Sequence, residues 1–342
     1  MLAARFYEPN KPLRLEQIDV PAFGENDVLV RIKASGICGS EMHVWKGRDT
    51  SGITPRTLGH EGAGVIEKIG KNVTTVSPGD RVLVDYNITC GACRYCRSGR
   101  ENLCLNLQYV GYQKDGTYQE YMAVPARNAI KLPSNVSFEE GAIISCGVVT
   151  AFHGTRQADI QIGDRVIIIG LGGVGLHGIQ FARMQGAGQI MAVDVLESKL
   201  KLAKELGADY VVNPMKEDFV AKAKELWGGA DVAFEFIGLS KTIKDMIRSL
   251  ARGGKAVVVG MCFQDVTFNP EGDFRYLEAQ IRSSSDHTTE DFRRLLDLVS
   301  QKKIDLSKSI THKLKLEEVN RGFEMLDSKQ DNPVRIVMQH PQ

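Results

Sequence analysis

Cysteine is the residue type in this chain that is best suited to chemistry, and four of the seven cysteines lie close together. The stretch "CGACRYCRSGRENLC" spaces them as Cys-x2-Cys-x2-Cys-x7-Cys, at Cys90, Cys93, Cys96 and Cys104. Four thiolates close a tetrahedral zinc site that has no open position, so such a site stabilises a loop but cannot activate a substrate. The spacing predicts a structural zinc ion. An iron–sulfur cluster, disulfides in an oxidising compartment and incidental cysteines are the alternatives.

A second ligand set is spread along the sequence. Cys38 lies in "GICGSEMH", His60 in "GHEG" and Cys146 in "AIISCGVVTAFHG". Two thiolates and one imidazole are a ligand set of catalytic zinc, which keeps a fourth position for water or substrate. The three residues are far apart, and a lone cysteine often packs as a small apolar residue. Spacing alone therefore does not establish this second metal site. No motif explains Cys262, which is expected to be a packed cysteine.

The segment "RVIIIGLGGVGLHG" has the pattern of a buried strand, a glycine-rich turn and the start of a helix. Gly170, Gly172 and Gly175 form a G-x-G-x-x-G fingerprint, which binds the pyrophosphate of a dinucleotide at the helix N-terminus. Asp194 ends the next predicted strand, where a carboxylate accepts hydrogen bonds from ribose hydroxyls and repels a 2′-phosphate. The pattern predicts NAD rather than NADP.

Two kinds of secondary structure are expected to position these residues. Residues 1 to about 140 contain short β-rich runs bounded by Gly, Pro and Asp, which indicate an irregular β-barrel or sandwich. From about residue 160, six short apolar runs alternate with helical stretches, the pattern of a doubly wound parallel sheet. The six predicted strands are 165–170, 189–194, 209–213, 231–236, 255–260 and 280–285. Predicted helices at 289–303 and 315–328 and a strand at 334–339 return to the first domain.

Length and charge limit the class of protein. The 342 residues favour two domains, and 43 basic residues balance 42 acidic ones. Nothing indicates a nucleic-acid-binding or membrane-binding basic surface. No apolar run of about 18 residues and no signal-peptide pattern occur. We therefore expect a soluble cytoplasmic protein with small-molecule partners only.

These motifs, in this order, make nearly the whole chain resemble the zinc-dependent medium-chain alcohol dehydrogenases. The resemblance implies a catalytic GroES-like β-barrel domain at 1–145 with a zinc lobe at 88–106. It also implies a Rossmann NAD-binding domain at 146–287, and a return to the catalytic domain at 288–342. It implies two zinc ions per subunit. The implied ligands are Cys38, His60 and Cys146 for catalytic zinc, and Cys90, Cys93, Cys96 and Cys104 for structural zinc.

The same resemblance assigns roles to other residues. Ser40 and His43 match a relay that carries the substrate proton through the nicotinamide ribose to solvent, and Glu61 matches the acid behind the metal. Glu41 stands where the family often has an Asp that supports the zinc-ligand histidine. Trp45 and Tyr86 match positions that line the substrate pocket. Cofactor contacts are implied for Thr150, Gly170, Gly172, Gly173, Val174, Gly175, Asp194, Lys199 and Arg335.

The implied activity is reversible hydride transfer between an alcohol and NAD+, giving an aldehyde or ketone. Cys146 favours an alcohol dehydrogenase over the polyol, sugar or threonine dehydrogenases, which often have Glu near this position. Those dehydrogenases remain an alternative, as do a non-enzymatic zinc protein and a zinc-free quinone reductase. The chain is as short as microbial members that are often tetramers, so a homotetramer is expected, with a dimer as the alternative.

Overall fold

The computed structural model describes residues 1–341, which form two compact units. Unit 1 comprises residues 1–149 and 286–342, and unit 2 comprises residues 150–285. The chain thus leaves unit 1 after Val149 and returns to it at Asp286, a few residues from the expected boundaries at 145/146 and 287/288.

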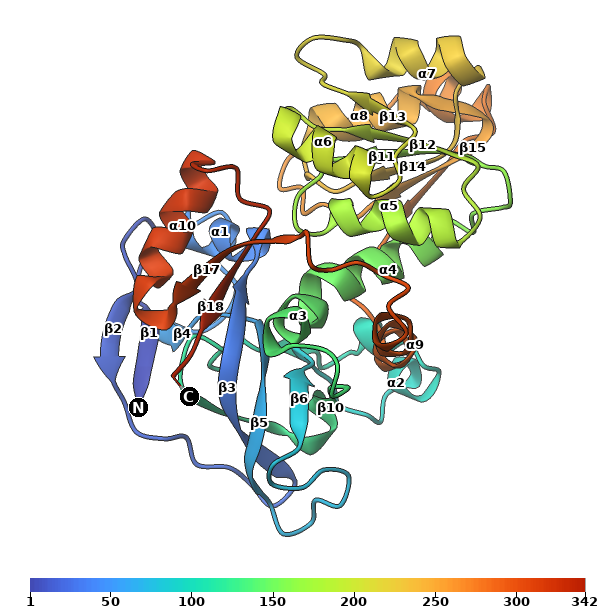
Figure 1. Ribbon diagram of the computed structural model, residues 1–342. Helices are drawn as coiled ribbons and strands as arrows, with labels where there is room; N and C mark the ends of the chain where they lie inside the picture. The colour runs from blue at the N-terminus through green and yellow to red at the C-terminus, as the bar shows by residue number, and fades with distance from the viewer. Residues whose placement is uncertain (342) are drawn as a thin grey trace. The chain divides into compact units, whose positions relative to one another are not determined.

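Unit 1 is built around a largely antiparallel sheet in the order β10-β6-β5-β3-β18-β17, with β9 also paired to β3. In the central strand β3 (Asp27–Ile37), Val28, Val30 and Ile32 are fully buried in one apolar cluster. These residues lie on one face of the strand, which packs against the barrel core. The C-terminal strand β18 (Arg335–Gln339) pairs with β3, so the end of the chain completes the first sheet (Figure 1).

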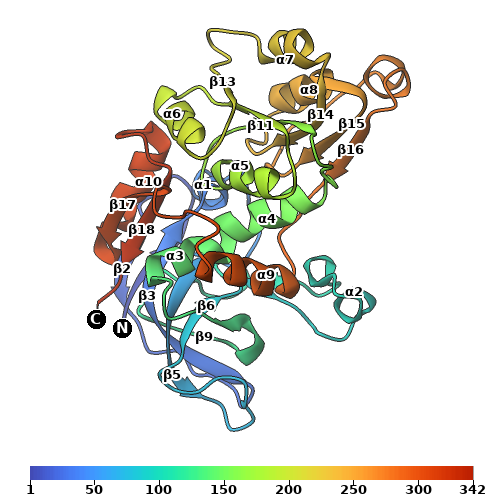
Figure 2. The same ribbon diagram turned by 45° about the vertical axis from the view of Figure 1, so that its right-hand side comes forward.

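Short elements complete unit 1. Helix α10 packs on the parallel pair β17 and β18 (Figure 1), and the segment around α2 stands apart from the barrel strands (Figure 2). The remaining strands are β1 (Leu2–Phe6), β2 (Arg14–Gln17), β4 (Arg56–Thr57), β5 (Glu61–Ile69), β6 (Arg81–Val84), β7 (Asn87–Ile88), β8 (Gln108–Tyr109), β9 (Tyr121–Pro125), β10 (Ala129–Lys131) and β17 (Ile310–Lys315). The helices are α1 (Gly39–Trp45), α2 (Arg94–Arg97), α3 (Phe138–Ile143), α9 (Thr289–Ser300) and α10 (Val319–Ser328), with a π-helical turn at Ile144–Val148.

Unit 2 is a six-stranded parallel sheet in the order β13-β12-β11-β14-β15-β16. All six predicted strands are present, and the sheet lies between α5 on one side and α7 and α8 on the other (Figure 1). The order reverses between β11 and β14, which is the doubly wound Rossmann topology. The strands are β11 (Arg165–Ile169), β12 (Gln189–Val193), β13 (Tyr210–Val212), β14 (Ala230–Glu235), β15 (Leu250–Val258) and β16 (Gln280–Ser283). The helices are α4 (Val149–Arg156), α5 (Gly175–Met184), α6 (Glu197–Glu205), α7 (Phe219–Trp227) and α8 (Ser240–Arg248).

No helix among residues 1–341 has both the length and the apolar character needed to span a membrane.

Candidate metal centres and cofactor loop

The three ligands predicted for a second metal meet in the interior of unit 1. Cys38 lies between β3 and α1, His60 directly precedes β5, and Cys146 lies in the π-helical turn. Their ligand atoms and a Glu61 carboxylate oxygen all lie within 4.8 Å of one another, and all four residues are buried. The fold therefore supplies the proximity that spacing along the sequence could not predict.

The distances fit a zinc ion. Tetrahedral geometry with zinc–sulfur bonds of about 2.3 Å places two sulfurs about 3.8 Å apart, and the Sγ atoms of Cys38 and Cys146 are 4.0 Å apart. His60 donates from Nδ1 to the Glu41 carboxylate at 2.9 Å, which leaves Nε2 for a metal. Glu41 also accepts from the backbone N–H of Cys38 at 3.0 Å. The Glu side chain thus still supports the histidine, despite its extra methylene.

Glu61 lies beside the cluster and is partnered by an arginine. Its carboxylate forms an ion pair with Arg335 and accepts a hydrogen bond from the backbone N–H of Gly147 at 3.2 Å. Arg335 is 2% exposed. A buried charge without a partner has a high free-energy cost, so the ion pair stabilises both Glu61 and Arg335 in their buried positions. The predicted contact of Arg335 with a pyrophosphate stays a prediction.

Ser40 and His43 share one face of helix α1, because residues three apart on a helix are neighbours. Burial raises the pKa of Tyr112, and the side chain of Ser40 near its hydroxyl opposes that rise. Burial, followed by the charge of Arg48, lowers the pKa of His43 below its ordinary value. A neutral imidazole is the form that can accept a proton.

Aromatic side chains surround His60. The Tyr86 ring meets the His60 ring edge-on with centroids 5.1 Å apart, and the Tyr112 ring lies 6.4 Å from it. Tyr86 was predicted from the sequence, whereas no motif pointed to Tyr112. Trp45 instead packs on Phe323 of α10 with ring centroids 5.8 Å apart, and it donates to the backbone of Lys11. Its predicted place in a substrate pocket stays a prediction.

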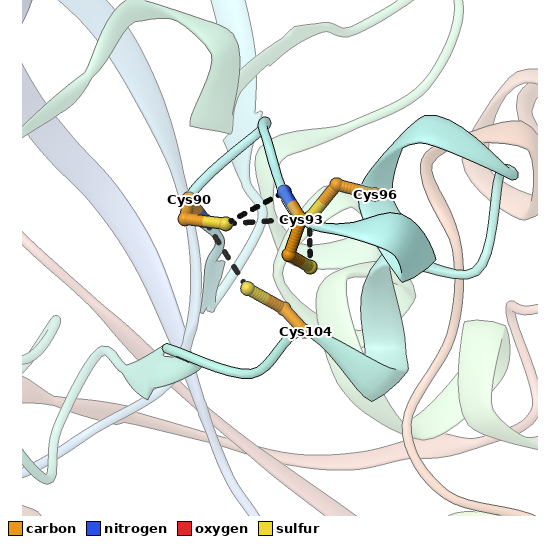
Figure 3. Close-up of side chains that lie close together, drawn as sticks. All are labelled: Cys90, Cys93, Cys96 and Cys104. Atoms are coloured by element: carbon orange, nitrogen blue, oxygen red, sulfur yellow. Dashed lines mark hydrogen bonds between the residues drawn. The ribbon is translucent and has the colours of Figure 1, made fainter.

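The four clustered cysteines converge around the turn that precedes α2 (Figure 3). Their Sγ atoms lie within 4.8 Å of one another, with 3.9 Å between Cys90 and Cys96 and 3.6 Å between Cys93 and Cys96. These separations lie on either side of the roughly 3.8 Å expected around tetrahedral zinc. Both separations exceed the roughly 2.05 Å of a disulfide bond, so the four cysteines are arranged for a metal ion rather than for two disulfides.

Backbone amides favour the thiolate form in the four-cysteine cluster, which is the form that binds a cation. The N–H groups around Cys96 and Leu105 lower the pKa of Cys93 to about 6, which favours its thiolate. Burial and the neighbouring cysteines raise the pKa of Cys96 to about 12. Four adjacent thiolates repel one another, and a bound divalent cation removes that repulsion.

The glycine-rich loop of unit 2 joins β11 to α5. Gly170 has φ of +90°, and a Cβ at Gly175 would lie only 1.9 Å from the Gly170 carbonyl oxygen, so both positions need glycine. A Cβ at Gly172 would meet no protein atom within 4 Å, which leaves space for a ligand beside the backbone. Gly173 lies in the same turn, and Val174 directly precedes α5. The N-terminus of α5 supplies the dipole end that favours a phosphate.

Asp194 directly follows β12, and its carboxylate stabilises the glycine-rich loop through a hydrogen bond. Its carboxylate accepts the backbone N–H of Leu171 at 2.8 Å and that of Leu196 at 3.0 Å. Lys199 lies in α6 and Thr150 in α4, both in unit 2. The loop, the acid and the free space at Gly172 fit a dinucleotide, whereas the roles of Lys199 and Thr150 stay predictions.

Comparison with known proteins agrees with these geometries. Residues 24–134 match the alcohol dehydrogenase GroES-like domain, and residues 173–301 match the zinc-binding dehydrogenase family. An alcohol dehydrogenase of Geobacillus stearothermophilus is 36% identical over 97% of this chain and 98% of its own length. An L-threonine 3-dehydrogenase of Rhizobium etli is 33% identical over 97% and 96%. A crystal structure of a zinc-binding dehydrogenase from Sinorhizobium meliloti bound to NADP matches with a TM-score of 0.91 and 30% identity, covering 99% and 98% of the two chains.

The fold, the two cysteine-containing clusters and these matches define a zinc-dependent oxidoreductase. The chain belongs to the zinc-dependent medium-chain dehydrogenase family, with a GroES-like domain and a Rossmann domain. Its cofactors are zinc and a nicotinamide dinucleotide, NAD or NADP.

Proposed function

We propose that the protein is an NAD-dependent zinc alcohol dehydrogenase, which interconverts an alcohol with its aldehyde or ketone. The observation that carries this proposal is the buried set of Cys38, His60 and Cys146, with Glu61 beside it, in a chain that also carries the dinucleotide loop. Bound zinc supplies a Lewis acid for the substrate oxygen, and bound NAD+ accepts the hydride.

The residues of the chain provide positioning and a route for the proton. Glu41 fixes the His60 ring through Nδ1, so that its other nitrogen faces the two thiolates. The Ser40 hydroxyl takes the proton of the substrate oxygen as it gives up its own hydroxyl proton to the relay, and the Tyr112 hydroxyl lies near it. His43, on the same helix face, takes up the released proton and passes it to water.

The choice of NAD rests on Asp194. Its carboxylate stands at the end of β12, where the ribose hydroxyls of a bound dinucleotide lie in this fold. Because the carboxylate is held by two backbone N–H groups, it cannot swing away to admit a 2′-phosphate. The related structure with NADP makes NADP the alternative to test.

A polyol or threonine dehydrogenase on the same scaffold is the second candidate, since the relative from Rhizobium etli acts on L-threonine. We also propose that the enzyme is cytoplasmic and a homotetramer. The grouping of six of the seven cysteines at two metal-binding clusters supports a reducing compartment, where clustered cysteines bind metal rather than form disulfides.

The decisive experiment measures metal content and NADH formation together. We expect about two zinc ions per chain and a rise in NADH absorbance with at least one alcohol from a panel of primary, secondary, cyclic and polyhydroxy compounds. A matched run with NADP+ tests the cofactor. A zinc-loaded protein that binds NADH but oxidises none of these alcohols contradicts the proposal.

A further inference from the structure

A buried hydrogen-bonded pair in unit 1 lies outside both predicted metal sites. His287 is 1% exposed, and its Nε2 lies 2.9 Å from a carboxylate oxygen of Asp85, which is 6% exposed. Asp85 directly follows β6, and His287 follows Asp286, the residue at which the chain re-enters unit 1. The two partners are 202 residues apart, so no local motif in the sequence predicts their contact.

The pair belongs to a network that fixes the backbone on both sides of Tyr86. The Asp85 oxygen that contacts His287 also accepts the backbone N–H of Asn87 at 2.9 Å. The Asn128 side chain donates to the backbone carbonyl of Asp85 at 2.8 Å and to that of Asn87 at 2.9 Å. Asn87 and Asn128 are buried as well. Because a buried polar group that loses its partner has a high free-energy cost, these bonds favour one conformation of the segment.

The His287 ring also contacts the Tyr86 ring. These two rings meet edge-on with centroids 4.9 Å apart, and the ring of Phe292 in α9 meets His287 edge-on at 4.5 Å. The Tyr86 ring in turn meets the His60 ring edge-on at 5.1 Å. Edge-to-face packing at such distances is a favoured arrangement of aromatic pairs. The contacts make a continuous row of four rings, which begins at Phe292 and ends at the metal-ligating His60.

The orientation of the His60 imidazole depends on more than one contact. Its Nδ1 donates to Glu41 at 2.9 Å, but a ring that is held at one atom can still tilt about that bond. The Tyr86 ring packs against the imidazole and limits this tilt. Residues that orient a metal ligand from outside the ligand set typically change metal affinity or activity by about 10- to 100-fold when they are lost.

We propose that His287 is a positioning residue of the catalytic centre. Held by Asp85, its ring fixes the Tyr86 ring, which in turn keeps the His60 imidazole directed toward the two thiolates. The alternative is that His287 only anchors the returning chain in unit 1. This inference rests on the proposed function, because it takes the buried cluster that contains His60 as the catalytic centre.

Cobalt(II) in place of zinc reports the geometry at His60 without turnover, because its visible absorption depends on the arrangement of the ligands. The four-cysteine cluster has no histidine ligand, so its contribution should be equal in all variants and cancel in difference spectra. His287→Gln keeps a donor for Asp85 but removes the ring. We expect it to shift the cobalt absorption and to lower kcat for alcohol oxidation by about tenfold, with metal content and the KM for NAD+ near wild-type values.

Two substitutions of Asp85 test the hydrogen bond that holds the ring. Asp85→Ala removes the partner of His287, and we expect it to shift the cobalt absorption and to lower kcat by about tenfold. Asp85→Asn still offers an oxygen that accepts from His287, so its kcat should stay within about threefold of the wild type, with an unshifted spectrum.

Tyr86→Leu removes the ring between His287 and His60 and leaves the buried pair with Asp85 intact. It should therefore reproduce the spectral shift of His287→Gln, which keeps the test open should His287→Gln fold poorly. His340→Gln is the matched control, because it changes another buried histidine of unit 1, which contacts Ser35. The control should leave the cobalt spectrum and kcat near wild-type values.

The outcomes separate this inference from the proposed function. A His287→Gln protein with lower stability but a wild-type cobalt spectrum and kcat would show that His287 only anchors the chain, and it overturns the inference. A wild-type spectrum in Tyr86→Leu overturns it as well. A shifted cobalt spectrum in His287→Gln, together with a wild type that oxidises no alcohol, upholds the positioning of His60 and overturns the proposed function alone.

Discussion

Ser40 lies at the start of α1, near the Tyr112 hydroxyl, and is not one of the metal-ligating residues. We therefore expect Ser40→Ala to lower kcat/KM for alcohol oxidation by about 100-fold, the range of a positioned acid–base group. Zinc content and NADH affinity should stay near wild-type values. Loss of zinc in this variant would show instead that Ser40 maintains the metal site.

His43 lies further along the same helix, where water can replace it. Its pKa is lowered by burial, so the imidazole stays neutral and able to accept a proton at a lower pH than an exposed histidine would. His43→Gln should reduce alcohol oxidation by about tenfold near pH 7 and remove the acidic inflection from the pH profile. Added imidazole should restore part of the rate. A loss as large as that of Ser40→Ala, without rescue by imidazole, contradicts the relay.

Asp194 has two roles in our proposal: it binds the ribose hydroxyls, and its carboxylate accepts the backbone N–H of Leu171 in the glycine-rich loop and that of Leu196 in the turn before α6. Asp194→Gly combined with Val195→Arg should raise the ratio of kcat/KM for NADP+ over NAD+ by tenfold or more, since a repulsive charge is replaced by a phosphate partner. Asp194→Asn separates the two roles, because the Asn side chain still offers an oxygen that accepts the backbone hydrogen bond of the loop but carries no negative charge. A wild type that already prefers NADP+ overturns this assignment.

At the scale of single residues, the sequence predicts the zinc ligands and the cofactor loop better than it predicts the side chains around them. The four clustered cysteines and the glycine fingerprint follow from local spacing, which zinc and pyrophosphate require directly. Tyr112 has no such signature, because only the tertiary fold of unit 1 brings it beside His60, 52 residues earlier in the chain. The pairing of Glu61 with Arg335, 274 residues apart, is likewise a product of tertiary structure.

The four-cysteine lobe, as an element, depends on its metal. α2 has four residues and no buried residue, so the lobe has little apolar core of its own. Cys93→Ser should remove about one zinc ion per chain and lower the melting temperature, because it opens a closed tetrahedral site. Turnover per folded molecule should fall less than in Cys38→Ser, which changes the other cluster. Equal loss of turnover with unchanged stability contradicts the separation of the two sites.

The C-terminal strand β18 is followed directly by a buried histidine that joins it to β3. The Ser35 hydroxyl donates to the Thr117 carbonyl at 2.8 Å. His340 Nε2 lies 2.9 Å from the same hydroxyl oxygen, so this nitrogen must be the donor of the second hydrogen bond. The other ring nitrogen, Nδ1, is buried and has no hydrogen-bond partner among residues 1–341. Protonation would place an unsatisfied N–H there, and burial accordingly lowers the pKa of His340 to about 3.

This histidine should make folding sensitive to acid. Below about pH 6.5 the unfolded chain binds a proton at His340 that the folded chain does not, so stability falls as the pH falls toward 3. The contribution is about 1.4 kcal/mol per pH unit. Denaturant unfolding between pH 6 and 4.5 should show a shallower loss for His340→Gln than for wild type, with His312→Gln on β17, whose ring is not buried, as control. Parallel losses in wild type and His340→Gln contradict the assignment.

The elements of unit 2 were predictable because strands buried on both faces are short, apolar and β-branched. The sequence "SKTIKDMIRSLARGG" predicts a helix over 240–254, and this prediction is wrong at its end, because α8 stops at Arg248 and β15 begins at Leu250. Pairing of Leu250 with Ala230, before a register shift, draws this segment into the sheet. Strand β17 was not predicted, because its alternating polar residues have no apolar run and its place depends on pairing with β18.

At the scale of the whole molecule, unit 2 ends in an open sheet edge. β16 pairs only with β15, all four of its residues are exposed, and Ile281 is 42% exposed. An exposed edge strand with an apolar side chain is a template for pairing with another chain, unless charges or a bulge protect it. The edge therefore supports an assembly of copies of this chain through β16.

Ile281→Lys places a charge on that edge and should shift the protein toward smaller assemblies. Light scattering on eluted protein should give a multiple of 37.7 kDa for the wild type and a smaller multiple for Ile281→Lys. Ile162→Lys, at an isoleucine that is 95% exposed and outside any strand, is the matched control and should keep the wild-type mass. NADH affinity should change little, because Asp194 follows β12, on the far side of β11, β14 and β15 from the edge. A wild type of 37.7 kDa, or equal masses for the two variants, would show that β16 is not the contact between subunits.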